Sequence, residues 1–491
     1  MPPEVVLRGG RVIDPASGRD EVTDVVVVAD RVSTVGDAGE RDPRDVLDVS
    51  GLIVGPGFVD LHSHVHSVAG HRLQALDGVT TSLELEAGVL PVETAYALAA
   101  AEGRPLHYGF SASWAAARMH VLAGVALDGA LDPFLAHIGD PAWQRDASGP
   151  ETQRMLALLR AALGDGALGV GVLVGYAPRT DPAEYLAVAA LAAEAGAPTY
   201  THVRELVEAD PTTPVDGSFE LVRAAAETGA HMHHCHVNST SRRHVDRVLA
   251  LLERSRDEGS RVTVEAYPYG AGATGIGAYF LEPERLGAWG ITPRSLTYLP
   301  TGERVADTHR LRQLRREDPG GATIVEFLDE DDPADAALLH RSLALPDAIV
   351  ASDAMPLALP AGTDPLAWPL PPGTVTHPRT AGTFARSLRT MVRETGAWSW
   401  VEAFRRCSLL PAAVVADVAP AMLAKGRLAV GADADLVVID PAVITDRATY
   451  VDGARPSTGI VHSFVAGQQV VRGGQLLTDA MPGRPIRGVP Q

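Results

Sequence analysis

The sequence predicts an α/β fold, a (β/α)8 TIM barrel with a small β-sandwich that is formed by both termini. Two observations favour it. Through the middle of the chain, apolar β-rich runs alternate with stretches rich in Ala, Leu and Glu, which is typical of a parallel sheet built from βα units. At both ends of the chain, short β-rich runs are separated by Gly, Asp and Pro turns, which is typical of a small β domain.

Eight apolar runs in the middle of the chain predict the eight strands that close such a barrel. They are residues 57–62, 79–86, 107–113, 167–173, 198–203, 230–237, 261–267 and 347–353. Helices are expected between these runs, for example over residues 182–195 and 241–258. Active sites of these barrels form at the carboxyl ends of the strands, so functional residues are expected there.

The same patterns divide the chain into two domains. Residues 1–54 and 418–491 are assigned to the β-sandwich domain, and residues 55–417 to the barrel. The stretch from about 278 to 346 is charged and too long for one βα crossover. It is therefore predicted to be an insertion over the barrel mouth.

The bulk composition excludes several classes of partner. A formal net charge of −19 provides no basic surface for a phosphate backbone or an anionic membrane, so neither nucleic acid nor a membrane is expected as a partner. The two cysteines, Cys235 and Cys407, fit a reducing compartment, and the amino-terminal residues show no signal peptide. We therefore expect a cytoplasmic protein and leave homo-oligomerisation open.

Residue types that bind metal ions gather at the carboxyl ends of five predicted strands. His62 and His64 stand two apart, so both imidazoles leave the same face of a strand and can reach one ion. Imidazole and carboxylate suit Zn²⁺, with Mn²⁺ or a similar ion as the alternative. The predicted ligands of one or two ions are His62, His64, a glutamate at 84 or 86, His202, His236 and Asp353.

Asp353 ends an apolar run, IVASD, in which packing explains a carboxylate poorly. We expect it to be the general base that takes a proton from the attacking water. Taken singly, each histidine is more often a satisfied polar or surface residue than a ligand. The neighbouring histidines are expected to be supporting, turn or packing residues: His66, His71, His231, His233 and His234.

A series of segments resembles one known family. In chain order it contains GPGFVDLHSH, YTHVRE, HCHVNS, EAYPYGAGAT, ASDAMP, HPRTAGTFARSLRTMVRE and GRLAVGADADLVVID. The series resembles the amidohydrolase superfamily and, within it, the N-acyl-D-amino-acid deacylases, or D-aminoacylases. The HxH and GADADL pieces are typical of the whole superfamily, whereas HPRxxGTFxR and YPYxAG are more specific. The resemblance spans nearly the whole chain.

The resemblance implies a zinc-dependent hydrolase in which metal-activated water cleaves a carbon–nitrogen amide-type bond of a small molecule. It assigns His202 and His236 to the more tightly held zinc, and acid and base duty to Asp353. It assigns Arg379 to the substrate carboxylate, which a guanidinium binds with two parallel hydrogen bonds. Pairing of Arg379 within the protein is the alternative.

The chain departs from the family at the second strand. A cysteine that the deacylases carry there is Ala87 in this chain, and the only lysine, Lys425, lies in the terminal β region, so a carboxylated lysine bridge is excluded. A carboxylate can replace the thiolate as a harder ligand. We favour Glu86, which lies nearer the strand end, with Glu84 as the alternative to it. The other interpretation is that these glutamates form salt bridges to Arg204 or hydrogen bonds.

Two substrate positions of the family also differ. Its lysine after the sixth-strand histidine is Asn238 here, and the serine of its YPYTAGST segment is Ala273, whereas Tyr267 is kept. Asn238 and Tyr267 are predicted to bind substrate together with Arg379. These differences leave open a cyclic amide, imide or ureido hydrolase, as in dihydroorotase or hydantoinase, and a non-catalytic scaffold with the same fold.

Overall fold

The computed structural model describes residues 4–39 and 45–489. The chain forms two compact units. The first contains the described residues up to Leu83 together with Ala99–Gly109 and Ile349–Ile486, and the second contains Glu84–Leu98, Phe110–Ala348 and the described residues from Arg487 onward. The predicted sandwich bounds include residues 1–3, 40–44 and 490–491, which lie outside the described residues.

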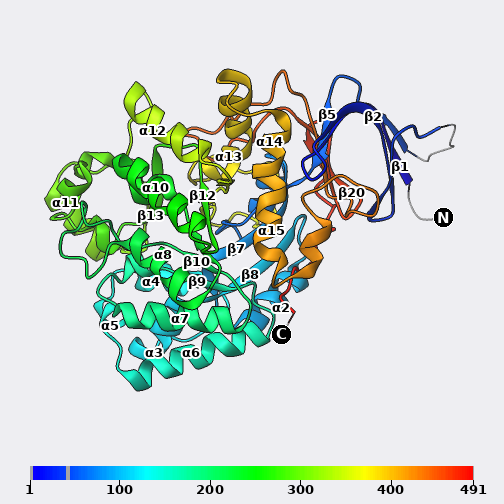
Figure 1. Ribbon diagram of the computed structural model, residues 1–491. Helices are drawn as coiled ribbons and strands as arrows, with labels where there is room; N and C mark the ends of the chain where they lie inside the picture. Colours follow the sequence, from blue (N-terminus) through cyan, green and yellow to red (C-terminus); the bar gives the residue numbers. More distant parts are fainter. Residues whose placement is uncertain (1–3, 40–44, 490–491) are drawn as a thin grey trace. The chain divides into compact units, whose positions relative to one another are not determined.

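Eight strands form one sheet in the order β17-β12-β11-β10-β9-β8-β7-β6, which confirms the predicted barrel strands (Figure 1). They are β6 (Phe58–Asp60), β7 (Val79–Val89), β8 (His107–Ser113), β9 (Val170–Val172), β10 (Thr199–Thr201), β11 (Met232–His234), β12 (Val262–Ala266) and β17 (Ile349–Val350). Each strand lies within its predicted run, except that β7 continues to Val89. All residues of β7 are buried, as expected for a barrel strand that is covered on both faces.

The two end strands of this order meet within the first unit. Ser63, after β6, forms a parallel bridge with Ala354, after β17. Asp60 reinforces the junction, because its carboxylate accepts hydrogen bonds from the Ser352 N–H (2.9 Å) and from the Gln74 side chain (2.9 Å). Burial raises the pKa of Asp60 to about 6, although these bonds oppose the rise. The junction brings the ends of the sheet together as a barrel requires.

The helices begin where their sequences place caps. In α7 (Pro182–Glu194), Asp181 accepts the N–H of Ala183 and proline occupies the first turn, and α12 (Pro333–Ala344) starts in the same way behind Asp332. The expected helices over 182–195 and 241–258 are confirmed as α7 and α10 (Val245–Asp257).

In the second unit α3 (Trp114–Ala123), α5 (Pro141–Gln144), α6 (Gly149–Gly164) and α7 lie side by side (Figure 1). The other helices are α1 (Val68–Ala75), α2 (Val92–Glu102), α4 (Asp132–His137), α8 (Gly217–Thr228), α9 (Val237–Ser241), α11 (Thr308–Glu317), α13 (Arg379–Ser387), α14 (Trp400–Phe404) and α15 (Leu410–Ala416).

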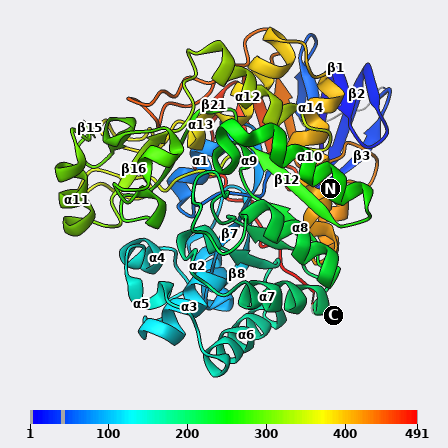
Figure 2. The ribbon, with the colours of Figure 1, turned by 60° about the vertical axis from the view of Figure 1, so that its left-hand side comes forward.

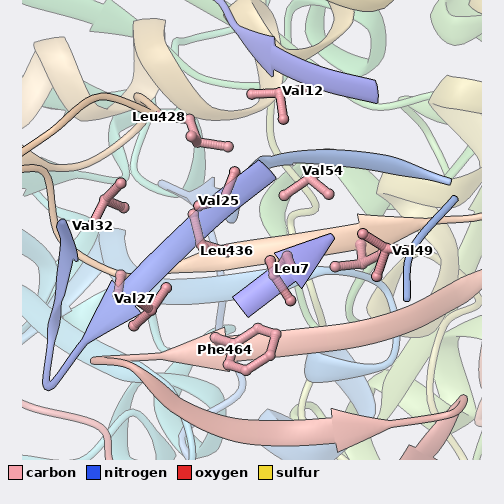
Figure 3. Packing of buried hydrophobic residues seen from close by; sticks show 12 residues of the cluster. Leu7, Val12, Val25, Val27, Val32, Val49, Val54, Leu428, Leu436 and Phe464 are labelled. Carbon is pink, nitrogen blue, oxygen red and sulfur yellow. The ribbon is translucent and has the colours of Figure 1, made fainter. Parts of the chain in front are cut away.

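Strands from both ends of the chain form one nine-stranded sheet, so a β domain built from both termini is observed. Its strands are β1 (Glu4–Asp14), β2 (Arg19–Val28), β3 (Arg31–Val35), β4 (Asp45–Asp48), β5 (Ile53–Pro56), β18 (Leu436–Ile439), β19 (Ile460–Val465), β20 (Gln468–Arg472) and β21 (Gln475–Leu476). Apolar side chains from these strands pack into a buried cluster, with Leu7, Val54, Leu436 and Phe464 among its members (Figure 3). Burying one such side chain stabilises the fold by about 1.5–3 kcal/mol. The exact domain bounds stay a prediction.

A buried ionic clamp lies in the first unit. The Lys425 ammonium contacts the carboxylates of Asp433 (3.0 Å) and Asp435, and Asp435 also lies 3.0 Å from His107 Nε2. Asp435 further accepts the Ala466 N–H at 2.7 Å. The pKa of Asp435 is held far below its usual range, because His107 and Lys425 outweigh its burial, and the pKa of Lys425 is raised by the two aspartates. We call Lys425, Asp433, Asp435 and His107 the Lys425 clamp.

Another buried carboxyl group in the first unit belongs to Asp77. It accepts hydrogen bonds from the N–H groups of Phe384 (2.8 Å) and Ala385 (3.0 Å) in α13, and from the Ser457 hydroxyl (2.8 Å). Burial nevertheless raises the pKa of Asp77 to about 8. Asp77 therefore joins α13 to the segment before β19 through a buried carboxyl group.

The second unit also contains a separate antiparallel sheet in the order β13-β16-β14-β15. Its strands are β13 (Ala271–Gly275), β14 (Leu296–Tyr298), β15 (Glu303–Arg304) and β16 (Ala322–Glu326), and α11 lies beside it (Figure 2). The sheet begins before the predicted insertion at 278, and α12 ends close to residue 346. In the part of the chain that the structure describes, no helix is both long and apolar enough to cross a bilayer.

Candidate functional site

Each unit carries one group of predicted ligands. In the second unit, Glu86 of β7 meets His202, which follows β10, and His236, which follows β11. Glu86 Oε1 lies 2.6 Å from His236 Nε2 and 3.2 Å from His202 Nδ1. Each residue offers one ligand atom within 4.8 Å of the other two. We call Glu86, His202 and His236 the Glu86 cluster.

The geometry of β7 separates the two glutamates that the sequence left as alternatives. Glu84 and Glu86 stand two apart and so share one face of the strand. The Glu84 carboxylate accepts the N–H groups of Ala87 (3.1 Å) and Gly88 (3.3 Å), whereas the Glu86 carboxylate meets the two histidines. Arg204, the other partner considered, forms a two-pronged pair with Glu220. The arrangement supports Glu86 as the ligand.

His236 is held by its neighbours in an uncommon backbone conformation. Its φ is +30° and its ψ is +60°, a left-handed conformation that residues with side chains seldom adopt. Its N–H donates to Glu265 Oε1 (3.3 Å), and its Nδ1 lies 3.0 Å from the Ser239 hydroxyl. Such strain is of order 1–3 kcal/mol and persists only where the surroundings over-determine it. These contacts aim Nε2 at Glu86.

Two glycines of the β9 segment leave room for the cluster. A Cβ on Gly175 would overlap the His202 ring, and a Cβ on Gly171 would overlap the backbone carbonyls of Leu85 and Glu86. Neither glycine has a left-handed φ, so the requirement is one of space. Any other residue at these positions would displace a ligand or the strand that carries one.

The atoms of the Glu86 cluster suit a metal ion. His202 Nδ1 is buried and lies 3.2 Å from Glu86 Oε1, and it has no hydrogen-bond partner among the described residues. Burial lowers the pKa of His202, so its imidazole is neutral and able to bind a cation. Two imidazole nitrogens and one carboxylate oxygen are the ligands of many catalytic zinc sites, which keep a further position open for water. The residues therefore fit Zn²⁺.

In the first unit, His62, His64 and Asp353 form a second group, which we call the Asp353 cluster. His62 Nε2 lies 3.1 Å from His64 Nε2, and Asp353 Oδ1 lies 3.4 Å from the first nitrogen and 3.5 Å from the second. Asp353 has a φ of +50°, so it too is in a left-handed conformation. The N–H of His62 donates to Asp60 at 3.3 Å, which ties the cluster to the junction between β6 and β17.

Arg379 is buried against Asp353. Its Nη2 lies 2.8 Å from Asp353 Oδ1, and its Nε donates to the Asp353 carbonyl oxygen. This contact is the internal pairing that the sequence analysis left as the alternative to substrate binding. The guanidinium orients the carboxylate of the predicted base, and its role toward a substrate stays a prediction.

The other two predicted substrate residues lie in the second unit and contact each other. Asn238 Oδ1 accepts the Tyr267 N–H (3.3 Å), and its Nδ2 donates to the Tyr269 carbonyl (3.4 Å). Asn238 therefore fixes the backbone of the YPY segment, which differs from the direct substrate contact predicted for it. Tyr267 is buried, and its ring packs edge-on against His236 with centroids 6.4 Å apart. A substrate role for either residue stays a prediction.

The neighbouring histidines of β11 make protein contacts. His233 lies between Thr263 (2.8 Å) and Glu265 (2.9 Å), and His231 reaches the same threonine hydroxyl at 3.0 Å. His234 lies 3.1 Å from the Ser218 hydroxyl, and burial lowers its pKa to about 3. These contacts are those of supporting and packing residues, as the sequence analysis predicted.

Sequence reasoning missed three residues that hold these clusters. Glu265 accepts the His236 N–H, Ser239 contacts its ring, and Asp60 accepts the His62 N–H. An available signal was that Asp60 and Glu265 are carboxylates inside apolar runs, as Asp353 is. Buried carboxylates of this kind are costly unless hydrogen-bonded or paired.

Comparison with known proteins agrees with this geometry. Residues 45–471 match the model of the amidohydrolase family. The chain belongs to the amidohydrolase family. Among its relatives, an N-acyl-D-glutamate deacylase of Alcaligenes xylosoxydans xylosoxydans is 30% identical over 511 aligned residues, which cover 99% of this chain and 96% of the relative. Membership makes this chain a metal-dependent hydrolase of amide-type carbon–nitrogen bonds.

Solved amidohydrolases share the fold. An N-acyl-D-glutamate deacylase from Bordetella bronchiseptica, complexed with zinc and a phosphonate inhibitor that mimics the tetrahedral intermediate, has a TM-score of 0.77 and 25% identity. The structural alignment covers 99% of this chain and 100% of the Bordetella chain. A D-aminoacylase, studied for the functional role of its binuclear metal centre, has a TM-score of 0.76 at 23% identity, with 98% and 99% coverage. The barrel and the β-rich sheet of this chain are thus those of an amidohydrolase.

Proposed function

We propose that this amidohydrolase removes the acyl group from N-acyl-D-amino acids, with Zn²⁺ as its ion. The observation that carries the proposal is the Glu86 cluster, in which three buried ligand atoms converge and His202 Nδ1 has no hydrogen-bond partner among the described residues. The relative with 30% identity over nearly the full chain acts on N-acyl-D-glutamate, which supports the substrate class. The zinc complex of the Bordetella deacylase supports the ion.

The proposed ligands of the tightly held ion are Glu86, His202 and His236. When bound there, Zn²⁺ supplies Lewis acidity that polarises the substrate carbonyl and makes a water molecule more acidic. His62 and His64, with Asp353, are the proposed ligands of a second ion, which the binuclear centre described for D-aminoacylase supports. Mn²⁺ or a similar ion is the alternative.

Asp353 is the proposed general base. It accepts a proton from the attacking water and passes it to the leaving nitrogen, so that amide and water become a carboxylic acid and an amine. Arg379 Nη2 lies 2.8 Å from the Asp353 carboxylate, and Arg379 Nε donates to the main-chain carbonyl of Asp353. These two contacts fix the orientation of the carboxylate and thereby the direction of proton transfer. Asp353 needs this orientation because a base acts only within hydrogen-bond reach of the proton it takes.

The proposed substrate is a small molecule, and the binding residues are Arg379, Tyr267 and Asn238. Asn238 also hydrogen-bonds the backbone of the YPY segment, so it would fix the shape of that segment in addition to binding substrate. The family lysine is missing at this position, and the substrate carboxylate is therefore left to Arg379. A cytoplasmic location, inferred from the two cysteines, belongs to the same proposal.

The test combines metal analysis with a substrate screen. Purified protein is expected to contain one or two equivalents of zinc and to hydrolyse N-acetyl-D-amino acids faster than the L forms, dihydropyrimidines or hydantoins. Glu86→Gln is expected to lose the tightly held ion and to lower kcat/KM at least about 10³-fold, because the ion contributes several kcal/mol to the transition state.

Glu84→Gln is the matched control. It lies on the same face of β7, and a glutamine oxygen can still accept the N–H groups of Ala87 and Gly88, so zinc content and activity are expected to persist. A faster reaction with cyclic ureides would replace the proposed substrate class. A metal-free protein that is inactive on every compound would favour the scaffold interpretation.

A further inference from the structure

We propose that Arg242 and Glu205 form a positioning pair that fixes the two histidines of the Glu86 cluster, His202 and His236. The inference rests on the proposed function, since it concerns the same metal ligands. The Arg242–Glu205 pair is not expected to contact substrate. The pair sets the separation and direction of the two imidazoles before an ion binds.

The pair joins the two loops that carry the histidines. Glu205 lies three residues after His202, and Arg242 lies six residues after His236, at the end of α9. Arg242 Nη2 donates to Glu205 Oε2 at 2.6 Å. Both residues are buried, with exposed fractions of 4% and 8%. A buried charge of either sign would be costly alone, so the two side chains hold the loops together.

Arg242 also reaches the His236 ring through one intermediate. Its Nη1 donates to the Ser239 carbonyl oxygen (3.3 Å), and the Ser239 hydroxyl lies 3.0 Å from His236 Nδ1. The guanidinium stacks over Trp289, with its central carbon 3.8 Å from the ring centroid. A planar guanidinium that is fixed on three sides is a rigid support.

The backbone of Arg242 is strained. Its φ is +49° and its ψ is −121°, a conformation that favours glycine. Strain of this kind costs of order 1–3 kcal/mol and accumulates at functional sites. Glycine would relieve it, but glycine has no guanidinium. The strained arginine at this position is explained if its side chain is needed to place the ligands.

The next residue in the chain provides a matched control. Arg243 pairs with Asp335 of α12, with Nη2 2.7 Å from Oδ2, and its side chain is 59% exposed. It shares the charge and the segment of Arg242, but its carboxylate partner lies in α12, outside the two loops. Arg243→Met therefore reports the loss of a neighbouring arginine alone.

The experiment measures the affinity of the protein for Zn²⁺, by competition with a chromophoric chelator, in Arg242→Met, Glu205→Gln, the double variant and Arg243→Met. Loss of a residue that orients a metal ligand typically weakens binding about 10–100-fold. We expect that loss in both single variants, no further loss in the double variant, and no change in Arg243→Met. The absorption spectrum of the Co²⁺-loaded protein is expected to shift in the first three variants only.

Arg242→Gly separates positioning from stability. It relieves the strained backbone but leaves the buried Glu205 without its partner, as Arg242→Met does. We therefore expect a higher melting temperature than that of Arg242→Met, which keeps the strain, together with Zn²⁺ binding as weak as in Arg242→Met. Arg242→Lys keeps a positive charge next to Glu205 and is the second variant in case Arg242→Met does not fold. We expect its affinity for Zn²⁺ to be less than tenfold weaker than that of wild type. Wild-type affinity in Arg242→Gly, or additive losses in the double variant, would overturn the inference.

Failure of the inference is distinguishable from failure of the proposed function. Wild-type protein that binds no ion, or Glu86→Gln that binds Zn²⁺ as wild type does, contradicts the metal site itself. Strong binding by wild type and by Arg242→Gly, with loss in Glu86→Gln, leaves the metal site intact and rejects only the positioning pair.

Discussion

The Glu86 cluster and the Lys425 clamp are both buried groups of ionisable side chains, yet they are composed in opposite ways. In the clamp, the Lys425 ammonium is matched by Asp433 and Asp435, and Asp435 also accepts from His107 and a main-chain N–H. In the Glu86 cluster, a carboxylate faces two imidazoles, and His202 Nδ1 has no hydrogen-bond partner among the described residues. The Lys425 clamp contains its own cation, whereas the Glu86 cluster is suited to bind a cation from solution.

This difference teaches how a buried ionic group can be classified without a bound ion. A structural network balances donors against acceptors, because every unsatisfied buried group destabilises the fold. A ligand set for a metal ion leaves acceptors facing one another. The Asp353 cluster combines both features, because two histidine nitrogens lie 3.1 Å apart next to a carboxylate oxygen that also pairs with the Arg379 guanidinium.

Asp353→Asn is expected to lower kcat by about 10²–10⁴-fold, the contribution of a positioned general base. The asparagine oxygen can still accept from Arg379, so the fold and the ion at the Glu86 cluster are expected to persist. Steady-state kinetics with metal analysis of the same sample measure both. Asp446→Asn, which alters a buried carboxylate that pairs with Arg389, is the matched control. Activity within tenfold of wild type would remove Asp353 from the mechanism.

Lys425→Met removes the cation of the clamp from the buried Asp435 and from the half-buried Asp433, which also pairs with Arg31. Breaking such a pair is expected to reduce the free energy of unfolding by about 3–5 kcal/mol. Urea denaturation measures the loss, and Lys425→Arg, which keeps the charge, is the control. The folded fraction is expected to bind Zn²⁺ as wild type does. If the Lys425→Met protein instead failed to bind Zn²⁺ but kept its free energy of unfolding, the distinction between a structural Lys425 clamp and a metal-binding Glu86 cluster would be wrong.

Gly175→Ala places a methyl group against the His202 ring without changing any ligand. Overpacking of this kind costs about 1–3 kcal/mol, and displacement of His202 is expected to weaken Zn²⁺ binding about tenfold. Chelator competition measures the affinity. Gly164→Ala, at the end of α6 where a Cβ meets open space, is expected to have no effect. Unchanged binding in Gly175→Ala would show that His202 does not need this space.

The pH dependence of stability tests the buried carboxyl of Asp77. Its pKa is about 8 in the folded protein and 3.8 as the ordinary value, so between these values the folded state holds a proton that the unfolded state releases. Raising the pH through this window therefore destabilises the fold, by up to about 1.4 kcal/mol per pH unit. Urea denaturation at pH 6, 7 and 8 is expected to show a smaller slope in Asp77→Asn. Equal slopes would mean that Asp77 is already ionised.

The Lys425 clamp has the opposite dependence. The pKa of Asp435 is lowered in the folded protein, so its stabilising effect is present above its ordinary value and is lost as the pH falls below that value. The two carboxyls thus act in different pH windows and can be separated in one series of measurements.

Much of the barrel could be predicted from the sequence, because each strand is an apolar run and the predicted ligands other than Glu86 follow the end of one. The choice between Glu84 and Glu86 could be argued only weakly, since both lie on one face of β7. It depends on where the N–H groups of Ala87 and Gly88 point, and the sequence does not specify that direction.

Contacts between distant residues could not be predicted from local patterns. His107 and Asp435 are 328 positions apart, and Asn238 meets the backbone of Tyr267 only because β11 and β12 are neighbours. Arg242 gave no signal either, since it lies at the start of the helix expected over 241–258, where an arginine is an ordinary surface residue. Its strain and its pairing with Glu205 become visible only once the two loops are folded.

The pairing of β5 with β18 has a consequence for biosynthesis. Val54 and Val438 are neighbours in the terminal sheet, although most of the chain separates them. At about 5–20 residues per second, a ribosome needs roughly 20–80 s to make the intervening polypeptide. During that interval this edge of β5 lacks its later neighbour and leaves backbone N–H and C=O groups unpaired, which is the kind of edge that other chains can pair with.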